Sequence, residues 1–327
     1  MPLENDGKST LGVVVPGNNA FWKSVEYGAN DAAGDNDLHL IWKSDSSTDS
    51  SEWQIRAIEG FISQKLAGLI VSPNSRFELQ STIKKAVERG MIVVSLDSES
   101  LMSREDEDHS VTLVMTDQFA AGQLAAETMA SLINEKGRLA IIRYSAMTTV
   151  TEKREEGFLS KIRQYPEIEL VYEDMYVGSN PELAPEKLRT FLHIYCPNGR
   201  AGIDGIFVSH ESTACELLEL MRFVEFDKKI NFVAFGTDSR LVTGMLTYLV
   251  DALIVEQPVK MGKLAVETLA NRLRGEAVAP VVECGTFTIT IDNISTPYAQ
   301  ALLNPSSDEA MEILLAAPAG EEPENTD

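Results

Sequence analysis

The sequence predicts an α/β protein built from two doubly wound lobes, each with a parallel sheet, joined by a hinge. Three observations support this prediction. Short apolar runs alternate with helical segments of about ten to fifteen residues, which is the pattern of βαβ units. This alternation occurs in two successive series, each about as long as a small domain. The chain of 327 residues is also long enough to build two hydrophobic cores.

The first series begins with the apolar run Leu11–Val15, which Pro16 and Gly17 end and a helical segment follows. Such a run predicts a buried strand that leads into a βα loop. The next strands are expected at 39–42, 68–73, 91–97 and 111–115. Helices are expected at 51–65, 79–89 and 119–132, and a charged loop at 98–109.

The second series begins with a strand at 138–144 and ends with an alternating strand at 281–291. The strands between them are expected at 167–176, 205–209, 230–235 and 250–256. Helices are expected at 151–164, 182–195, 212–223, 239–249 and 259–274. We therefore divide the chain into an N-terminal lobe (10–116 and 250–281), a C-terminal lobe (117–249 and 282–305) and a polar tail (306–327), with the first crossing at Asp117.

Composition excludes several classes of partner. A formal net charge of −22 leaves no basic stripe for nucleic acid or for an anionic membrane surface. The three scattered cysteines indicate neither a disulfide framework nor a metal site, and we interpret them as small apolar residues. No run of about eighteen apolar residues predicts a membrane span. The polar amino terminus contains no signal core, so either the protein is cytoplasmic or an export signal is missing from this sequence.

The end of the first predicted strand is the clearest candidate site. Ligands of open parallel sheets bind at the carboxyl ends of the strands, and here the chain places Asn18, Asn19, Phe21 and Trp22. Amides offer donors and acceptors, and an aromatic face covers the apolar face of a sugar ring or small polyol. The alternative is that the two aromatic residues only anchor the helix start on the core.

The sequence carries no catalytic signature. No GxGxxG follows a strand, and neither GxSxG nor HExxH occurs. The four histidines are too dispersed for a metal cluster. We therefore expect no cofactor, no metal and no catalytic residue, which favours ligand binding. A hydrolase with a dispersed site would show the same pattern.

Five short motifs, in this order, carry a resemblance to a known family: Asn19–Trp22, Val93–Asp97, Thr116–Gly122, Arg154–Phe158 and Val250–Pro258. Together they resemble the type I periplasmic binding proteins of the ribose- and galactose-binding kind. The ligand domain of lactose-repressor-type regulators shares that fold. The resemblance covers roughly residues 11 to 305.

The resemblance implies a set of ligand-binding residues, some of which depart from the family pattern. His210 stands where asparagine is usual, Asp238 is displaced by two positions, and Glu256 stands where glutamine is usual. The implied residues are Asn19, Phe21, Trp22, Asp97, Ser98, Arg154, Tyr176, His210, Asp238, Glu256 and Gln257.

For two of these residues, a role in ligand binding can be compared with a purely structural alternative. Asp97, at a strand end, offers an ionised acceptor to sugar hydroxyls, and its alternative is a helix or turn cap. Arg154 offers a fork of N–H donors to a ring oxygen and a hydroxyl. Its alternative is a surface ion pair with Glu155 or Glu156.

The resemblance implies an extracytoplasmic solute-binding protein. Such a protein is a periplasmic monomer that closes its lobes on a small carbohydrate or polyol. It then delivers the ligand to an ABC transporter permease, without catalysis and without nucleic acid, and a lipid anchor is left open. The first alternative is the sensor domain of a transcription regulator, although no headpiece precedes residue 11. The second is an α/β enzyme that acts on a sugar.

Overall fold

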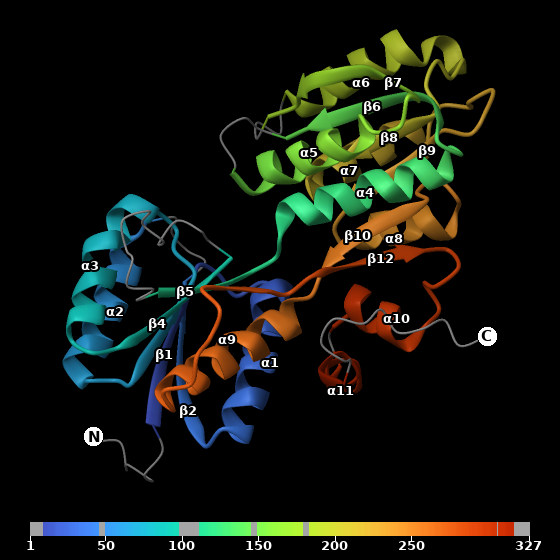
Figure 1. Cartoon of the computed structure of the whole chain (residues 1–327). Helices are drawn as coiled ribbons and strands as arrows, with labels where there is room; N and C mark the ends of the chain where they lie inside the picture. Colours follow the sequence, from blue (N-terminus) through green and yellow to red (C-terminus); the bar gives the residue numbers. More distant parts are fainter. Residues whose placement is uncertain are drawn as a thin grey trace. The chain divides into compact units, whose positions relative to one another are not determined.

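The computed structural model describes residues 9–45, 50–97, 111–144, 149–178, 183–305 and 307–316 (Figure 1). These residues form two units, each built on one six-stranded sheet. Unit 1 contains the chain up to Thr116, Gln257–Cys284 and a segment that begins at Pro305. Unit 2 contains Asp117–Glu256 and Gly285–Asn304. The predicted class, two α/β lobes with parallel sheets, is confirmed.

The sheet of unit 1 is parallel throughout and has the strand order β11-β5-β4-β3-β1-β2. Its strands are β1 (Ser9–Val15), β2 (Leu38–Ser44), β3 (Gly68–Val71), β4 (Ile92–Leu96), β5 (Val111–Met115) and β11 (Val281–Glu283). Its helices are α1 (Ala20–Asp35), α2 (Glu52–Gln64), α3 (Arg76–Glu88), α9 (Pro258–Leu273) and α11 (Asp308–Ala316).

Helices cover both faces of this sheet. Successive strand residues point to opposite faces, so Val14 of β1 joins the core cluster that contains Ile58 of α2. Val13 joins the other cluster, with Val25 of α1 and Val266 of α9. The apolar run recognised in the sequence is therefore a strand buried on both sides.

Helices α1 and α9 lie in backbone contact. A Cβ atom at Gly28 would overlap the carbonyl oxygen of Val259, and one at Gly262 would overlap the carbonyl oxygen of Val25. Any larger residue at either position would push the two helices apart.

Unit 2 has the strand order β12-β10-β9-β8-β6-β7, in which only the β10–β12 pair is antiparallel. Its strands are β6 (Lys136–Arg143), β7 (Glu167–Tyr176), β8 (Gly205–Val208), β9 (Asn231–Phe235), β10 (Ala252–Glu256) and β12 (Thr286–Thr290). Its helices are α4 (Gln118–Leu132), α5 (Thr149–Ile162), α6 (Ala184–Tyr195), α7 (Glu211–Met221), α8 (Ser239–Leu246) and α10 (Pro297–Leu303), with a 3₁₀ turn at Pro197–Gly199. Helices α4 and α5 pack on a core that contains Phe158 and Phe207, whose rings stack 4.0 Å apart.

The structure corrects two predicted lobe assignments. Residues 250–256 were expected in the N-terminal lobe, but β10 pairs with β9 and β12 in the second sheet. The expected single strand at 281–291 is two strands, because the chain leaves β11 in the first sheet at Cys284–Gly285 and enters β12 in the second. Gly285 has a φ of 72°, which glycine adopts without the strain of a Cβ. An apolar run shows that a strand is buried but not which sheet buries it.

The predicted polar tail contains a helix. α11 packs against α1 and α9, and it buries Ala310, Met311 and Leu314. The spacing of these three residues matches one face of a helix. Acidic residues precede and interrupt this short apolar pattern, so the sequence alone did not predict this helix.

Two smaller predictions concern the described part of the chain. The three cysteines are buried and free of disulfides, as expected for small apolar residues. In the described residues, no helix is both long enough and apolar enough for a membrane span.

Candidate ligand-binding site

In unit 2, the carboxyl ends of the parallel strands carry polar and aromatic side chains. They are Arg143 and Tyr144 at β6, Tyr176 at β7, Ser209 and His210 after β8, Phe235 at β9 and Glu256 at β10. This edge of an open α/β sheet is where ligands bind, and several of these side chains contact one another or the side chains of α4 and α5.

Arg154 of α5 is the centre of the cluster, with only 6% of its surface exposed. Its Nε and Nη2 both donate to Oε1 of Gln118, at 3.0 and 2.6 Å, and its Nη1 donates to the carbonyl oxygen of Ser209 at 2.8 Å. The guanidinium carbon lies 3.7 Å from the ring centre of Phe235, a cation–π contact. These partners fix the orientation of the guanidinium before any ligand arrives.

Close packing of α4 on α5 brings these partners together. A Cβ at Gly122 of α4 would overlap the carbonyl oxygen of Arg154, and a Cβ at Gly157 of α5 would overlap that of Phe119. The close approach lets Gln118, in the first turn of α4, reach the Arg154 side chain.

Glu256, at the end of β10, completes this group. Its Oε1 accepts a hydrogen bond of 2.8 Å from Nε2 of Gln118 and lies 3.6 Å from Nη2 of Arg154. A guanidinium, an amide and a carboxylate therefore lie together at one edge of the sheet. This combination of donors and acceptors suits a ligand rich in hydroxyl groups.

The predicted alternative for Arg154, a surface ion pair with Glu155 or Glu156, is wrong. Arg154 is buried, and the partner of Glu155 is Arg143, whose Nε donates to Oε2 at 2.6 Å. Glu155 has no exposed surface, and its Oε1 accepts from the backbone N–H of Tyr144 at 3.0 Å and from the hydroxyl of Ser209 at 2.6 Å. Three donors therefore stabilise the buried carboxylate.

His210 lies at the same edge, before the first turn of α7. Its ring stacks on Tyr144 with ring centres 3.7 Å apart and an angle of 8° between the planes. Its Nδ1 lies 2.9 Å from the hydroxyl oxygen of Ser212. Burial, and secondarily the charge of Arg154, lowers the pKa of His210 to about 4. The imidazole is therefore neutral at neutral pH and offers one donor and one acceptor.

Asp238 has a different environment. Its carboxylate caps α8 and forms an ion pair with Arg240, with Oδ2 2.8 Å from Nη2. The hydrogen bond from the Arg240 side chain lowers the pKa of Asp238 to about 2. The backbone N–H groups of Thr237 and Asp238 donate to Oε2 of Glu211, at 2.6 and 3.0 Å. The structure therefore shows Asp238 in a capping role.

The predicted residues of unit 1 follow β1 and β4. Asn19 caps α1, because its Oδ1 accepts from the backbone N–H of Trp22 at 3.1 Å. Phe21 and Trp22 meet edge to face with ring centres 5.1 Å apart, and both pack in part on the core. Asp97 follows β4 with a φ of 48°, and its backbone N–H donates to the carbonyl of Val114 at 2.9 Å. These residues lie at the carboxyl edge of the first sheet.

The remaining predicted residues are Ser98, Tyr176 and Gln257. Ser98 lies outside the described residues. Tyr176 ends β7, and the guanidinium carbon of Arg143 lies 4.5 Å from its ring centre. Gln257 precedes α9 and belongs to unit 1, although the neighbouring Glu256 belongs to unit 2.

Comparison with known proteins gives these observations a family. The sequence profile of the periplasmic binding protein domain matches residues 11–277. The chain belongs to this family. The resemblance found in the motifs is therefore confirmed, and the two parallel-sheet units are those of a type I periplasmic binding protein.

Individual relatives of this periplasmic binding protein are distant in sequence. The ribose import binding protein RbsB of Bacillus subtilis is 22% identical over 279 residues, which are 85% of this chain and 86% of the relative. An ABC transporter solute-binding protein from Burkholderia graminis, solved in complex with D-arabinose, is 25% identical with a TM-score of 0.71. The match covers 89% of this chain and 98% of that structure. The periplasmic component of an ABC-type sugar transport system from Hahella chejuensis is 28% identical with a TM-score of 0.67, over 86% and 99% of the two chains.

The sequence analysis of this periplasmic binding protein missed several residues of the cluster. They are Gln118, Arg143, Tyr144, Glu155, Ser209 and Phe235. The positions of Arg143, Tyr144, Ser209 and Phe235 at strand ends were a usable signal, because that edge binds ligands. Gln118 and Glu155 lie inside helices, and only tertiary contacts show their role.

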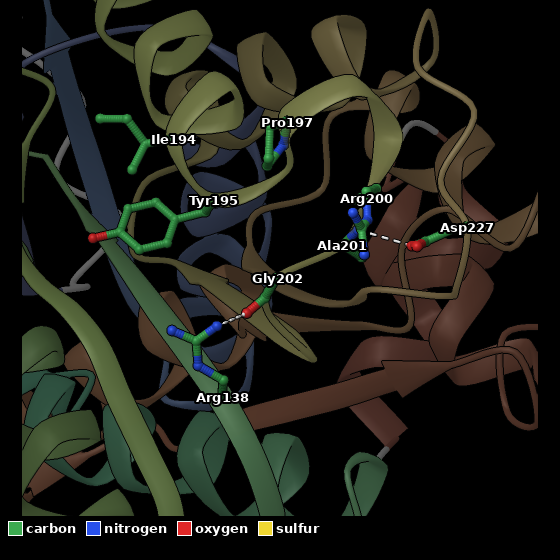
Figure 2. Close-up of a pocket in the computed structure, with 8 residues that line it drawn as sticks. All are labelled: Arg138, Ile194, Tyr195, Pro197, Arg200, Ala201, Gly202 and Asp227. Atoms are coloured by element: carbon green, nitrogen blue, oxygen red, sulfur yellow. Dashed lines mark hydrogen bonds between the residues drawn. The ribbon is translucent and has the colours of Figure 1, made fainter.

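Two further features of the protein lie outside this cluster. Among the described residues, no group of three or more His, Cys, Asp or Glu side chains has the arrangement of a metal site. A cavity of about 430 Å³ in unit 2 is lined by residues such as Arg138, Tyr195 and Asp227 (Figure 2). Arg138 lies near the start of β6, at the opposite end of the strand from Arg143. None of the predicted site residues lines this cavity.

Proposed function

We propose that this protein is an extracytoplasmic solute-binding protein that captures a small carbohydrate or polyol and delivers it to an ABC transporter permease. The relatives support this proposal, since they include a ribose import binding protein and a solute-binding protein solved with D-arabinose. These relatives are transport proteins, which favours transport over a sensor domain of a regulator and over an enzyme.

The single observation that carries the proposal is the fixed guanidinium of Arg154 at the carboxyl edge of the second sheet. Gln118, Ser209 and Phe235 hold it in place, so a ligand gains directional hydrogen bonds without the entropic cost of ordering that side chain. Glu256 supplies a neighbouring acceptor. Arginine and carboxylate groups side by side suit the alternating donors and acceptors of sugar hydroxyls.

We further propose that residues of unit 1 contribute to binding of the same sugar. Phe21 and Trp22 are only partly buried, and an aromatic face gains binding energy by covering the C–H face of a sugar ring. Asp97 would accept hydrogen bonds from hydroxyl groups. We also propose that the protein acts as a monomer, which size-exclusion chromatography would test.

Isothermal titration of the purified chain against pentoses, hexoses, their sugar acids and polyols tests the proposal. We expect one or a few ligands to bind with a stoichiometry of one, to raise the melting temperature and to be recovered chemically unchanged. If no member of the panel binds or raises the melting temperature, the proposed function is wrong. If a bound sugar is converted to a product, the protein is an enzyme instead.

A further inference from the structure

Arg143 ends β6 beside the proposed sugar site, where Arg154 and Glu256 are proposed to bind the sugar. Its Nε is committed to Glu155 at 2.6 Å. In the described part of the chain, no acceptor meets its Nη1 or Nη2, which carry four N–H donors. The side chain keeps 13% of its surface exposed, whereas the side chain of Glu155 keeps none. A ligand at this edge therefore reaches the cation and not its counter-ion.

The aromatic ring of Tyr176 packs on this guanidinium at the strand end. Its central carbon lies 4.5 Å from the ring centre of Tyr176, a cation–π contact that restricts the orientation of the planar fork. Tyr144, the next residue, stacks on His210. The ring of Tyr176 therefore orients the fork in advance, as a specific binding contact requires.

The surrounding hydrogen bonds decide what kind of atom the fork needs. Arginine has donors only, so a ligand that covers Arg143 must supply acceptors. The nearby carboxylate of Glu155 is already saturated by Arg143, the Tyr144 N–H and the Ser209 hydroxyl. A hydroxyl offers one acceptor atom to the fork, whereas a carboxylate offers two at the spacing of the two Nη groups and adds a charge.

We propose that Arg143 is a ligand-binding residue and that it selects sugars that carry a carboxylate. This inference rests on the proposed function and narrows its ligand to a sugar acid, such as an aldonate or a uronate. Arg154 then binds the hydroxyl groups of the ring, and Arg143 binds the acidic end through its two Nη groups.

Titration of matched pairs tests the inference with the full chain. The pairs are D-galactose with D-galacturonate, D-glucose with D-glucuronate, and D-arabinose with D-arabinonate. We expect the acid of at least one pair to bind about tenfold or more tightly than its neutral partner, a factor in the range of one charge-assisted contact. The affinity for the acid should fall as salt is added, because the contact is ionic.

Variants at Arg143 assign the preference to this side chain. In Arg143→Gln the affinity for the acid should fall about tenfold or more, while that for the neutral sugar changes less than about threefold. Since that variant leaves Glu155 buried without its cation, the double variant Arg143→Gln/Glu155→Gln removes both charges and should show the same loss. Arg138→Gln is the matched control, because Arg138 lies near the start of the same strand, lines the cavity of Figure 2 and pairs with Glu169 at 3.4 Å. It should bind both sugars as the wild type does.

The outcomes separate this inference from the proposed function. If neutral sugars bind at least as well as their acids, or if Arg143→Gln weakens both members of a pair equally, carboxylate selection is wrong and sugar binding stands. If no sugar, sugar acid or polyol of the whole panel binds, and none raises the melting temperature, both proposals fail.

Discussion

Arg154 and Glu155 are consecutive residues of one helix, yet they have opposite roles. Arg154 turns toward Gln118, Phe235 and the end of β10. Glu155 turns toward Arg143 at the end of β6. Adjacent helix residues point about 100° apart, so a single turn of α5 supplies the groups that hold two different strand ends in place.

Replacing Glu155 tests its structural role. Glu155→Ala removes the acceptor of three donors and leaves the charge of Arg143 without its partner in a largely buried site. We expect the free energy of unfolding to fall by about 3 kcal/mol, measured by urea denaturation. Glu156→Ala, at the exposed next position, is the control and should change it by less than about 0.5 kcal/mol. Equal effects at the two positions would contradict the buried network.

His210 predicts a pH dependence of stability. Burial first, and the charge of Arg154 second, lowers the pKa of His210 from 6.5 to about 4 in the folded protein. Between these two values the unfolded chain binds more protons than the folded one, so folding loses stability as the pH falls through this window. We expect His210→Asn to lose less stability than the wild type between pH 7 and pH 4.5 in urea denaturation. Identical pH profiles would show that the folded imidazole titrates normally.

Among the elements, the contact between α4 and α5 positions the site. Glycines on both helices permit backbone contact, and this contact places Gln118 of α4 against Arg154 of α5. α1 and α9 of unit 1 meet in the same way, through Gly28 and Gly262. The two units therefore share one way of packing a helix pair, and in unit 2 it positions the buried Arg154.

Gly122→Ala should disturb both stability and binding. The added methyl group overlaps the carbonyl oxygen of Arg154, so α5 must shift, and we expect a loss of about 2 kcal/mol in the free energy of unfolding. Sugar affinity should fall as well, because the shift moves Arg154. Gly60→Ala in α2 is the matched control, since its Cβ meets open space. It should leave affinity unchanged and stabilise the helix by up to about 1 kcal/mol.

Within the residues that the structure describes, the chain passes between the two units at 116–117, 256–257, 284–285 and 304–305. The last passage leads to α11, which packs on α1 and α9 of unit 1. Aspartate and glutamate on α11 also act on Tyr27 of α1. Burial, followed by the charges of Asp308 and Glu312, raises the pKa of that phenol. The C-terminal helix is therefore part of the fold of unit 1.

Leu314→Ala tests this docking of α11. The leucine is 6% exposed, and its loss leaves a cavity, so we expect the free energy of unfolding of unit 1 to fall by about 2 kcal/mol. Urea denaturation, monitored through hydrogen exchange of the backbone amides in α1 and α9, measures the change in that unit. Glu312→Ala, on the exposed face of α11, should have little effect. A Leu314→Ala protein as stable as the wild type would mean that α11 contributes no packing energy.

Much of the fold was predictable because its signals are local. Apolar runs such as Leu11–Val15 and the helical periods that follow them identify βαβ units from neighbouring residues alone. The family resemblance also placed His210 after a strand of the second lobe, where the structure has it, but residues 250–256, which include Glu256, were assigned to the wrong lobe. Whether these residues bind a ligand stays a prediction.

The sequence by itself determined two parallel α/β lobes, the family and the edge of each sheet that carries polar groups. Only the tertiary structure decided the sheet that β10 joins, the helix at 308–316 and the partners of Arg154. Gln118 lies 36 positions from Arg154 and 138 positions from Glu256. Contacts over such separations depend on how whole helices and strands pack, and no local pattern of residues records that packing.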